Sequence, residues 1–407
     1  MIRSRSLGLQ ATLQAKMAKT RGLAKPPKAS TTTTTTTTTR AHGLAAAALV
    51  AVAAALVATQ LRGSGGPVVE VAVEPNGGGE PSTLTLDGSW QSVLHARYPE
   101  AQRIGLWDRH GVEVMWSSAG GRSGTAAAPP LPAGCTLYAV LDEFPWVWPG
   151  SPEIRTVDVG DAHVRLETLS VAPRVLLAHG VLSEEECDAV RSTATPSMEQ
   201  STTLVKGQTT VVQAGAPRTS STAWLKIADT TEPERSVLER VQRRVAMLAR
   251  LHVGSAENMQ VLRYLPGEHY HYHTDTGGSP SIAGRALTAL FYLNHNFSGG
   301  ETNFPMARRA EPMNNVYRVR EEFHNCQVDS GLTVRPQQGS VLLFYNLAPN
   351  SATKDFFTWH GSCDVESGEK WAANFWFHLN LMSAVRKRFG TRAHQFPART
   401  EGVGEEG

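Results

Sequence analysis

The sequence predicts an α+β fold, in which a sandwich or barrel of antiparallel strands follows two helices. After about residue 163, two segments of helical character come first, and several short apolar stretches separated by Gly-, Pro- and Asn-rich turns come after them. Helices and strands that are segregated along a chain indicate α+β architecture. A third observation is the length of 407 residues, which allows one large domain, or two, beside flexible segments.

The N-terminal residues 1–42 are predicted to be a disordered cytosolic tail. They carry basic but no acidic residues, and residues 31–39 are all threonine. Such a segment has too few apolar side chains to bury a core. For the whole chain the formal net charge is only +2. This balance argues against nucleic acid as the main partner, because proteins that bind phosphate backbones usually carry a basic surplus.

The next residues, 43–61, form an uncharged and mostly apolar run, GLAAAALVAVAAALVATQL. A membrane-spanning helix needs about 20 such residues. The preceding tail is far more basic than the following flank, which orients the N-terminus to the cytosol. We therefore expect a single-pass type II signal anchor, with the rest of the chain in the lumen of the endoplasmic reticulum or Golgi. The alternative is a cleaved signal or an organellar transit peptide.

Residues 62–81 are rich in Gly and Pro and are predicted to be a linker. Residues 82–162 contain short apolar runs such as GVEVMW and CTLYAVL, divided by a Gly/Ser/Pro-rich stretch, and predict a small β-rich accessory region. No chemical motif occurs in this region. The main α+β domain is expected over 163–385, followed by a polar tail over 386–407.

This main domain is predicted to begin with a strand and a helix, in RVLLAHGVLSEEECDAVRS. Ser183 is a suitable N-cap, and the three glutamates that follow it favour the positive end of a helix dipole. A second helix is expected over 233–250, where apolar residues follow helical spacing. The strands are then expected at 259–265, 269–275, 285–294, 340–346 and 374–382.

The stretch HYHYHTD contains the residues most suited to bind a metal. On a regular strand, His269, His271, His273 and Asp275 would share one face, and Tyr270 would lie on the other. One possible pattern is the HxH pair of His271 and His273, but it requires a glutamate soon afterwards, and none appears before Glu301. The other pattern is HxD, formed by His273 and Asp275. With a distant histidine it supplies a facial triad for Fe(II).

The distant ligand must come from a later strand. The candidates are His295, His324, His360, His378 and His394. His360 is followed ten residues later by Lys370. A lysine at that place could hold the far carboxylate of 2-oxoglutarate through charge-assisted hydrogen bonds.

These blocks carry a family resemblance, which spans about residues 163–381. The shared stretches are PRVLLAHGVLSEEECD, RTSSTAWL, QVLRYLPGEHYHYHTD, RALTALFYLNHNFSGGETNFP, VRPQQGSVLLFYNL and WHGSCDVESGEKWAANFWFH. The chain resembles the prolyl 4-hydroxylases among the Fe(II)- and 2-oxoglutarate-dependent dioxygenases. The resemblance implies a double-stranded β-helix, or jelly roll, supported by N-terminal helices.

The resemblance also implies roles for individual residues. The iron ligands would be His273, Asp275 and His360, which together with Lys370 form the catalytic set. The cosubstrate 2-oxoglutarate would be bound by Lys370, Tyr264 and Thr302. Peptide contacts would come from Tyr270, Arg285 and Trp376. His269 and His271 receive no role. Alternatively, Tyr264 and Trp376 are core aromatics and Arg285 is a surface charge.

The implied reaction consumes O2 and 2-oxoglutarate and hydroxylates peptidyl proline of a secretory-pathway protein, with L-ascorbate restoring oxidised iron. A proline-containing peptide or protein would be the partner, with no nucleic acid and no defined oligomeric state. Alternatives are a 2-oxoglutarate oxygenase that acts on another residue or substrate, and an inactive binding module of the same fold. The chain departs from the family at Asp364, where proline is usual, and in an insert at 306–330 that could reshape the substrate mouth.

The chain has only four cysteines and no CxxC motif, which excludes a disulfide scaffold and a zinc ribbon. If the compartment is oxidising, Cys326 and Cys363 are the more favoured pair, because both lie in the C-terminal half.

Overall fold

The fold was analysed in a computed structural model, which describes residues 69–86, 90–118, 131, 134–142, 144–151, 153–205, 208–211, 218–276, 284–323, 326 and 331–379. The predicted tails at 1–42 and 386–407 and the apolar run at 43–61 lie outside these residues. Among the described residues, no helix is long and apolar enough to cross a membrane.

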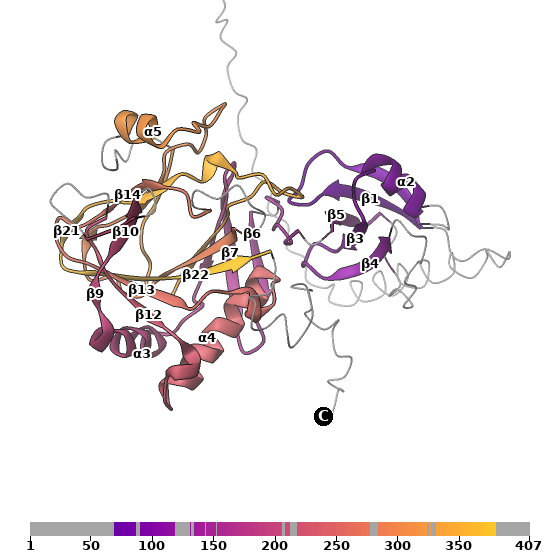
Figure 1. The fold of residues 1–407 in the computed structure, drawn as a ribbon. Coiled ribbons are helices and arrows are strands. Elements are labelled where there is room, and N and C mark those ends of the chain that lie inside the picture. Colours follow the sequence, from indigo (N-terminus) through magenta and orange to yellow (C-terminus); the bar gives the residue numbers. More distant parts are fainter. Residues whose placement is uncertain are drawn as a thin grey trace, which may run out of the picture. The chain divides into compact units, whose positions relative to one another are not determined.

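An accessory domain comes first, built around one five-stranded sheet (Figure 1). Its elements are β1 Val69–Pro75, β2 Ser82–Leu86, α2 Trp90–Arg97, β3 Arg103–Trp107, β4 Glu113–Ser118 and β5 Thr136–Leu141. The strand order is β2-β1-β5-β3-β4, and the central pair β1 and β5 is parallel, whereas the other pairs are antiparallel. The prediction that residues 62–81 are a linker is wrong in part, because β1 lies there and pairs with two strands.

Alternation along the accessory strands explains how this domain holds together. Val71, Ile104 and Leu137 point to one face of the sheet, where they pack with Trp90 and Leu94 of α2 in one apolar cluster. Tyr138, from the opposite face, belongs to the larger core of the second domain. The accessory sheet is therefore covered on both faces.

The second domain contains a nine-stranded sheet in which all neighbouring strands are antiparallel. We call it the major sheet, and its order is β6-β7-β8-β19-β15-β22-β13-β12-β9. The strands are β6 Ile154–Asp158, β7 His163–Val171, β8 Arg174–His179, β9 Glu199–Gln200, β12 Ser221–Leu225, β13 Met259–Tyr264, β15 Arg285–Tyr292, β19 Val341–Tyr345 and β22 Lys370–His378. Strand β6 places the start of this domain before the predicted boundary at residue 163.

A four-stranded antiparallel sheet, the minor sheet, has the order β14-β20-β17-β18. Its strands are β14 Tyr270–His273, β17 Thr302–Phe304, β18 Leu332–Val334 and β20 His360–Ser362. The remaining elements are the pairs β10 Thr202–Val205 with β11 Gln208–Val211 and β16 Ser298–Gly299 with β21 Val365–Ser367, the helix α5 Val316–Glu322, and 3-10 turns at Thr195–Ser197, Ile227–Asp229, Val253–Ser255 and Phe356–Thr358. The mainly antiparallel α+β fold is as predicted.

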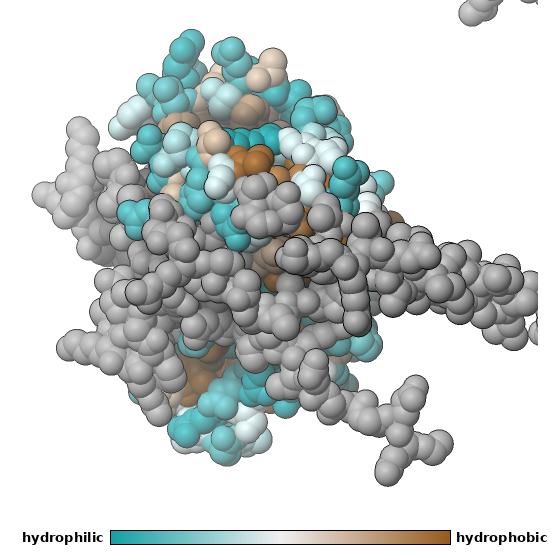
Figure 2. Space-filling view, turned by 90° about the vertical axis from the view of Figure 1, so that its right-hand side faces the viewer, coloured by the Kyte–Doolittle hydropathy of each residue, from teal (hydrophilic) through white to brown (hydrophobic). Residues whose placement is uncertain are grey.

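Two helices pack against the major sheet, as the sequence predicted (Figure 1). Helix α3, Glu184–Ala194, begins with a capping box in which Ser183 and Glu186 satisfy each other's backbone N–H groups. Helix α4, Glu234–Ala249, follows Pro233 and buries an apolar stripe that includes Val241 and Val245. On the side shown in Figure 2, the described surface is mostly hydrophilic, with smaller apolar patches.

Successive side chains of β22 point alternately to the apolar core and to the candidate site on the other face of the major sheet. Ala373, Phe375 and Phe377 belong to the apolar core that also contains the α4 stripe. The residues between them therefore point to the opposite face of the sheet. Lys370 and Trp376 both lie on that face, although they are six positions apart in sequence.

Candidate metal centre and cosubstrate site

Strand β14 is shorter than predicted and contains an irregularity that changes which side chains meet. Tyr270 pairs with Ser362 and His273 pairs with His360, so three steps on β14 match two steps on β20. This count defines a β-bulge. The prediction that four side chains from 269 to 275 share one face of a regular strand is therefore wrong. The bulge places His273 opposite His360, and Asp275 comes from the turn after β14.

His273, Asp275 and His360 lie together, in the geometry of a metal site. Asp275 Oδ1 is 3.4 Å from His273 Nε2 and 3.6 Å from His360 Nε2, and the ligand atoms all lie within 4.8 Å of one another. Within the described residues, this is the one group of three or more His, Cys, Asp or Glu side chains close enough to hold a metal. His271 does not join it, which removes the HxH interpretation.

Hydrogen bonds to the backbone set the tautomer of both histidines. The Nδ1 atoms of His273 and His360 lie 2.9 Å from the carbonyl oxygens of His271 and Thr358, respectively, and can only donate to them. The lone pair is then on Nε2, which faces Asp275. Burial lowers the pKa of His360 to about 4, although the Asp275 carboxylate acts in the opposite direction. His360 is therefore neutral at physiological pH, as a metal ligand must be.

Asp275 is held by its second oxygen, which leaves Oδ1 directed at the histidines. Thr288 Oγ1 donates to Asp275 Oδ2 at 2.6 Å, and Trp376 Nε1 donates to the same atom at 2.9 Å. These two donors are cross-strand partners on β15 and β22, which explains why both reach one carboxylate. Burial alone would raise the pKa of Asp275, but His360 and His273 hold it well below its usual range. A buried carboxylate and two imidazoles whose Nε2 atoms face it fit the facial triad that binds Fe(II).

Trp376 and Arg285 were predicted to contact substrate, and the structure gives both of them intramolecular partners. The Arg285 guanidinium carbon lies 3.5 Å from the centre of the Trp376 ring, and its nitrogens bond both carboxylate oxygens of Glu257 at 2.6 and 2.9 Å. His378 Nε2 lies 2.8 Å from Glu257. Burial raises the pKa of Glu257, but its bonds to His378 and Arg285 outweigh this and lower it to about 2. Glu257 was not among the predicted site residues, because no motif in the surrounding sequence marks it.

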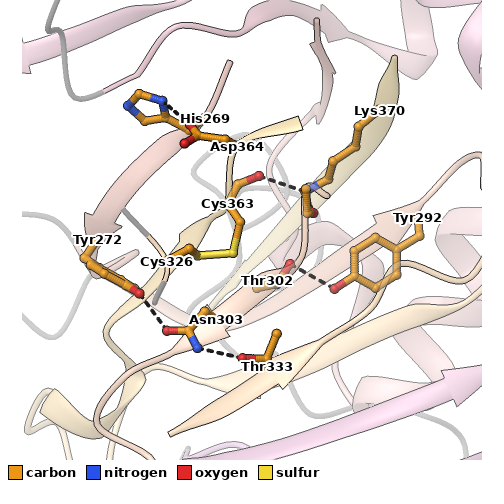
Figure 3. Close-up of a disulfide and its surroundings, with 12 residues drawn as sticks. His269, Tyr272, Tyr292, Thr302, Asn303, Cys326, Thr333, Cys363, Asp364 and Lys370 are labelled. Atoms are coloured by element: carbon orange, nitrogen blue, oxygen red, sulfur yellow. Dashed lines mark hydrogen bonds and ion pairs between the residues drawn. A yellow bond between two sulfur atoms is a disulfide. The ribbon is translucent and has the colours of Figure 1, made fainter. Parts of the chain in front are cut away.

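Lys370 is fully buried at the first position of β22 (Figure 3). Its Nζ donates to the carbonyl of Gly300 at 2.7 Å and to Ser362 Oγ at 2.8 Å. Burial lowers its pKa to about 7, against the attraction of Glu301. No ion pair of Lys370 occurs among the described residues. A buried ammonium with only neutral acceptors fits a site for an anionic ligand.

Two further residues predicted to bind the cosubstrate lie near this lysine. Tyr264 is the cross-strand partner of Lys370, and the ammonium lies 5.1 Å from the centre of its ring. Thr302 is buried on β17 opposite Ser362, where it accepts a 2.9 Å hydrogen bond from Tyr292 (Figure 3). The structure therefore brings Lys370, Tyr264 and Thr302 into one neighbourhood, which Ser362 completes.

Tyr270 does not point away from the ligand row as the sequence predicted. Its ring stacks on His273 with 3.7 Å between ring centres and an angle of 21°, and the Arg218 guanidinium carbon lies 4.8 Å from its ring centre. The bulge explains the difference, because it interrupts alternation between these two residues. Arg218 is buried and was missed as a site residue, although it stands in the RTSSTAWL block.

His269 and His271 lie in a small pocket outside the triad, beside Tyr272 and a disulfide. His269 Nδ1 is 2.8 Å from Asp364 Oδ1 (Figure 3). The disulfide joins Cys326 and Cys363, as the sequence favoured. It ties the insert to the residue that follows β20, directly after Ser362.

The described part of the insert at 306–330 packs over the minor sheet. Val319 of α5 and Phe323, the residue after this helix, form an apolar cluster with Tyr272 of β14 and Trp359. Arg320 Nε donates to the Tyr272 carbonyl at 3.1 Å. The insert therefore lies against the strand that carries His273.

Comparisons with known proteins agree with this geometry. Residues 259–378 match the family model of the 2OG-Fe(II) oxygenase superfamily. Prolyl 4-hydroxylase 5 of Arabidopsis thaliana is 34% identical over 227 residues, which cover 54% of this chain and 74% of that protein. Prolyl 4-hydroxylase 13 of the same plant is 34% identical over 231 residues, or 55% of this chain and 78% of that protein.

Among solved structures, the viral collagen prolyl hydroxylase of Paramecium bursaria Chlorella virus-1, in complex with 2-oxoglutarate, aligns at 22% identity and a TM-score of 0.33. The alignment covers 50% of this chain and 94% of that one. The sequence matches to the plant enzymes extend over most of their length. The chain therefore belongs to the prolyl 4-hydroxylase family of Fe(II)- and 2-oxoglutarate-dependent oxygenases.

Proposed function

We propose that the chain hydroxylates peptidyl proline, with Fe(II), 2-oxoglutarate and O2, on a jelly-roll catalytic domain. The observation that carries this proposal is the pairing of two sites. One is a triad of His273, Asp275 and His360 whose free ligand atoms face one another, and the other is the buried Lys370. A carboxylate-binding cation near an iron site is what a 2-oxoglutarate oxygenase requires.

The three triad residues would hold Fe(II). When bound, the metal supplies the redox chemistry that couples decarboxylation of 2-oxoglutarate, to succinate and carbon dioxide, with insertion of oxygen into a C–H bond. The protein's own contribution begins with orientation. Backbone carbonyls fix the Nε2 atoms of both histidines, and Thr288 and Trp376 fix the free oxygen of Asp275. L-ascorbate, typical of the family, would maintain the reduced metal.

Lys370 would bind the distal carboxylate of 2-oxoglutarate, with Tyr264 beside it and Thr302 as a further contact. Because the amine is buried, this ion pair would form away from water, where it is stronger than on the surface. The carbonyl of Gly300 and the hydroxyl of Ser362 hold the amine in place before ligand arrives. Such preorganisation lowers the ordering cost of binding.

The peptide would approach from the side of Tyr270, Arg285 and Trp376. Trp224 lies next to this group, with its ring centre 5.9 Å from that of Trp376, and its side chain is 46% exposed. Aromatic surfaces of this kind suit an extended polyproline II segment, whose conformation is already ordered before binding. The sequence similarity to plant prolyl 4-hydroxylases supports proline as the target.

The test is an assay of the full chain with Fe(II), ascorbate, 2-oxoglutarate and a panel of proline-rich peptides. We expect succinate to form in proportion to a mass gain of one oxygen on proline. The control peptides carry alanine in place of each proline, and the control enzyme is His360→Ala. Succinate formed without a mass change on any peptide would indicate another substrate. No metal binding and no turnover would indicate a binding module.

We also propose that residues 43–61 anchor the chain in the endoplasmic reticulum or Golgi membrane, with the catalytic domain in the lumen. The apolar run and its basic flank support this. A disulfide between Cys326 and Cys363 suits an oxidising compartment. Protease protection and carbonate extraction of tagged protein test the proposal. Release of the catalytic domain by carbonate would favour a cleaved signal or transit peptide instead.

A further inference from the structure

One stretch of chain contacts the surroundings of all three proposed ligands. We call residues 346–358, between β19 and β20, the bracket segment. At its start, Asn346 Nδ2 donates at 2.9 Å to Thr288 Oγ1, which in turn holds Asp275. Near its end, Lys354 Nζ donates at 3.2 Å to Thr274 Oγ1, the residue between His273 and Asp275.

The last residue of the bracket segment completes this arrangement. The carbonyl of Thr358 accepts the 2.9 Å bond from His360 Nδ1 that orients the ring. Asn346 and Thr358 are both fully buried, and the backbone N–H of Asp355 donates to the Asn346 carbonyl at 3.0 Å, which closes the segment into a loop. A displacement of this loop would therefore change the orientation of the proposed metal ligands.

The tip of the bracket segment is bound by the accessory domain. Asn350 Oδ1 accepts from Asn76 Nδ2 at 3.2 Å and from the backbone N–H of Leu141 at 3.1 Å. Asn350 Nδ2 donates to the carbonyl of Ala139 at 2.9 Å. One side chain thus makes three hydrogen bonds to β5 and to the residue after β1.

Both sides of this contact are fixed. Asn350 has a φ of 52°, in the left-handed region that asparagine tolerates better than most residues. Asn76 is only 2% exposed, and it also donates to Pro145 and accepts from Val147. Phe144 packs with Leu347, at the base of the bracket segment. The groups of the accessory domain that bind the Asn350 side chain are therefore held in place by their own buried contacts.

We propose that the accessory domain is a positioning element of the metal centre, acting through Asn350 on the bracket segment. Asn350 touches neither metal nor substrate. Its three bonds hold the tip of a loop whose other contacts orient Asp275 and His360. The proposal rests on the metal site of the proposed function and is independent of which substrate is hydroxylated.

The alternative is that Asn350 only joins two domains. The two possibilities differ in metal affinity, since a purely structural contact would change the unfolding temperature and leave the metal dissociation constant unchanged. Glycine is the best replacement, because it tolerates the positive φ and removes all three bonds. Thr353→Ala is the matched control, because Thr353 is exposed in the same loop and its backbone bond to Ala348 is kept.

The experiment titrates Mn²⁺, as a redox-inert probe, into the full chain by calorimetry and follows thermal unfolding of the metal-free protein. For Asn350→Gly we expect a metal dissociation constant raised roughly threefold to tenfold, below the effect typical of direct partners of ligands. Thr353→Ala should match the wild type. If Asn350→Gly does not fold, Asn350→Asp retains the two acceptor bonds but sets a carboxylate oxygen against the Ala139 carbonyl, so it should also raise the metal dissociation constant.

Equal metal affinities of wild type and either folded Asn350 variant would overturn this inference, whatever the change in unfolding temperature. Failure of the wild-type protein to bind the metal would overturn both this inference and the proposed function. A weakened metal affinity together with unaltered behaviour of Thr353→Ala would support it.

Discussion

The burial of Lys370 predicts that 2-oxoglutarate binding depends on pH in a defined direction. In the ligand-free site the pKa of this amine is lowered to about 7, because burial disfavours its charged form. The distal carboxylate of 2-oxoglutarate binds the charged amine. Above pH 7 most molecules must therefore take up a proton before they bind the ligand, so that the apparent affinity falls as pH rises.

The magnitude follows from the pKa. With a pKa of about 7, about ten elevenths of the amine is charged at pH 6 and about one eleventh at pH 8. The apparent dissociation constant of 2-oxoglutarate should then rise about tenfold between these two values. At pH 8 about 0.9 proton should be taken up for each ligand bound.

Calorimetry of the Mn²⁺-loaded protein, in two buffers of different ionisation enthalpy, measures both quantities. Lys370→Arg is the control, because arginine stays charged over this range and should show weaker but pH-independent binding. An affinity of the wild type that is constant from pH 6 to 8, with no proton uptake, would refute the assignment of Lys370 as the buried cation of the cosubstrate site.

Three other predictions concern the metal ligands, their support and the disulfide. His360→Ala should abolish both metal-induced thermal stabilisation and succinate formation, and retained coupled turnover would contradict the triad. Trp376→Phe removes one of two donors to Asp275, so we expect about tenfold weaker Mn²⁺ binding in calorimetric titration, and an unchanged value would show that the indole bond is dispensable. Replacing Cys326 and Cys363 by serine opens a loop of 37 residues and should lower the free energy of unfolding by about 2–4 kcal/mol in urea titration. An equal free energy of unfolding for this serine variant and the oxidised wild type would contradict a stabilising role of the disulfide.

The sequence predicted correctly those helices and strands that are determined by residues close together in the chain. The helix after Ser183 follows from its capping box, and the helix after Pro233 from its apolar spacing. The strands at 259–265, 285–294 and 340–346 follow from continuous apolar runs, and each is present within one or two residues of its predicted end.

Features that depend on distant pairing were not predictable in this way. The bulge in β14 is defined only against β20, so alternation alone placed Tyr270 on the wrong side of His273. The bond from Trp376 to Asp275 requires the register of β15 against β22. A signal for Thr288 was present, since it is the one threonine in a largely apolar strand, but the carboxylate to which it donates lies thirteen residues earlier.

The accessory domain shows the same limit. Its runs are short, and the central parallel pair joins β1 to β5 across more than 60 intervening positions. Parallel pairing requires a crossover and leaves no hairpin signal between its partners. Strands were therefore predicted for this domain, but β1 was mistaken for part of the linker predicted over residues 62–81.

Strand β22 has a consequence for engineering the chain. It carries Lys370 at one end and Trp376 near the other, on the face opposite the phenylalanines of the core. Inserting or deleting a single residue within it would exchange the two faces and send the amine into the hydrocarbon interior. Insertions or deletions in this strand should therefore prevent both correct folding and 2-oxoglutarate turnover. Libraries that seek new specificities can vary Trp224 or the insert, and should keep β22 at constant length.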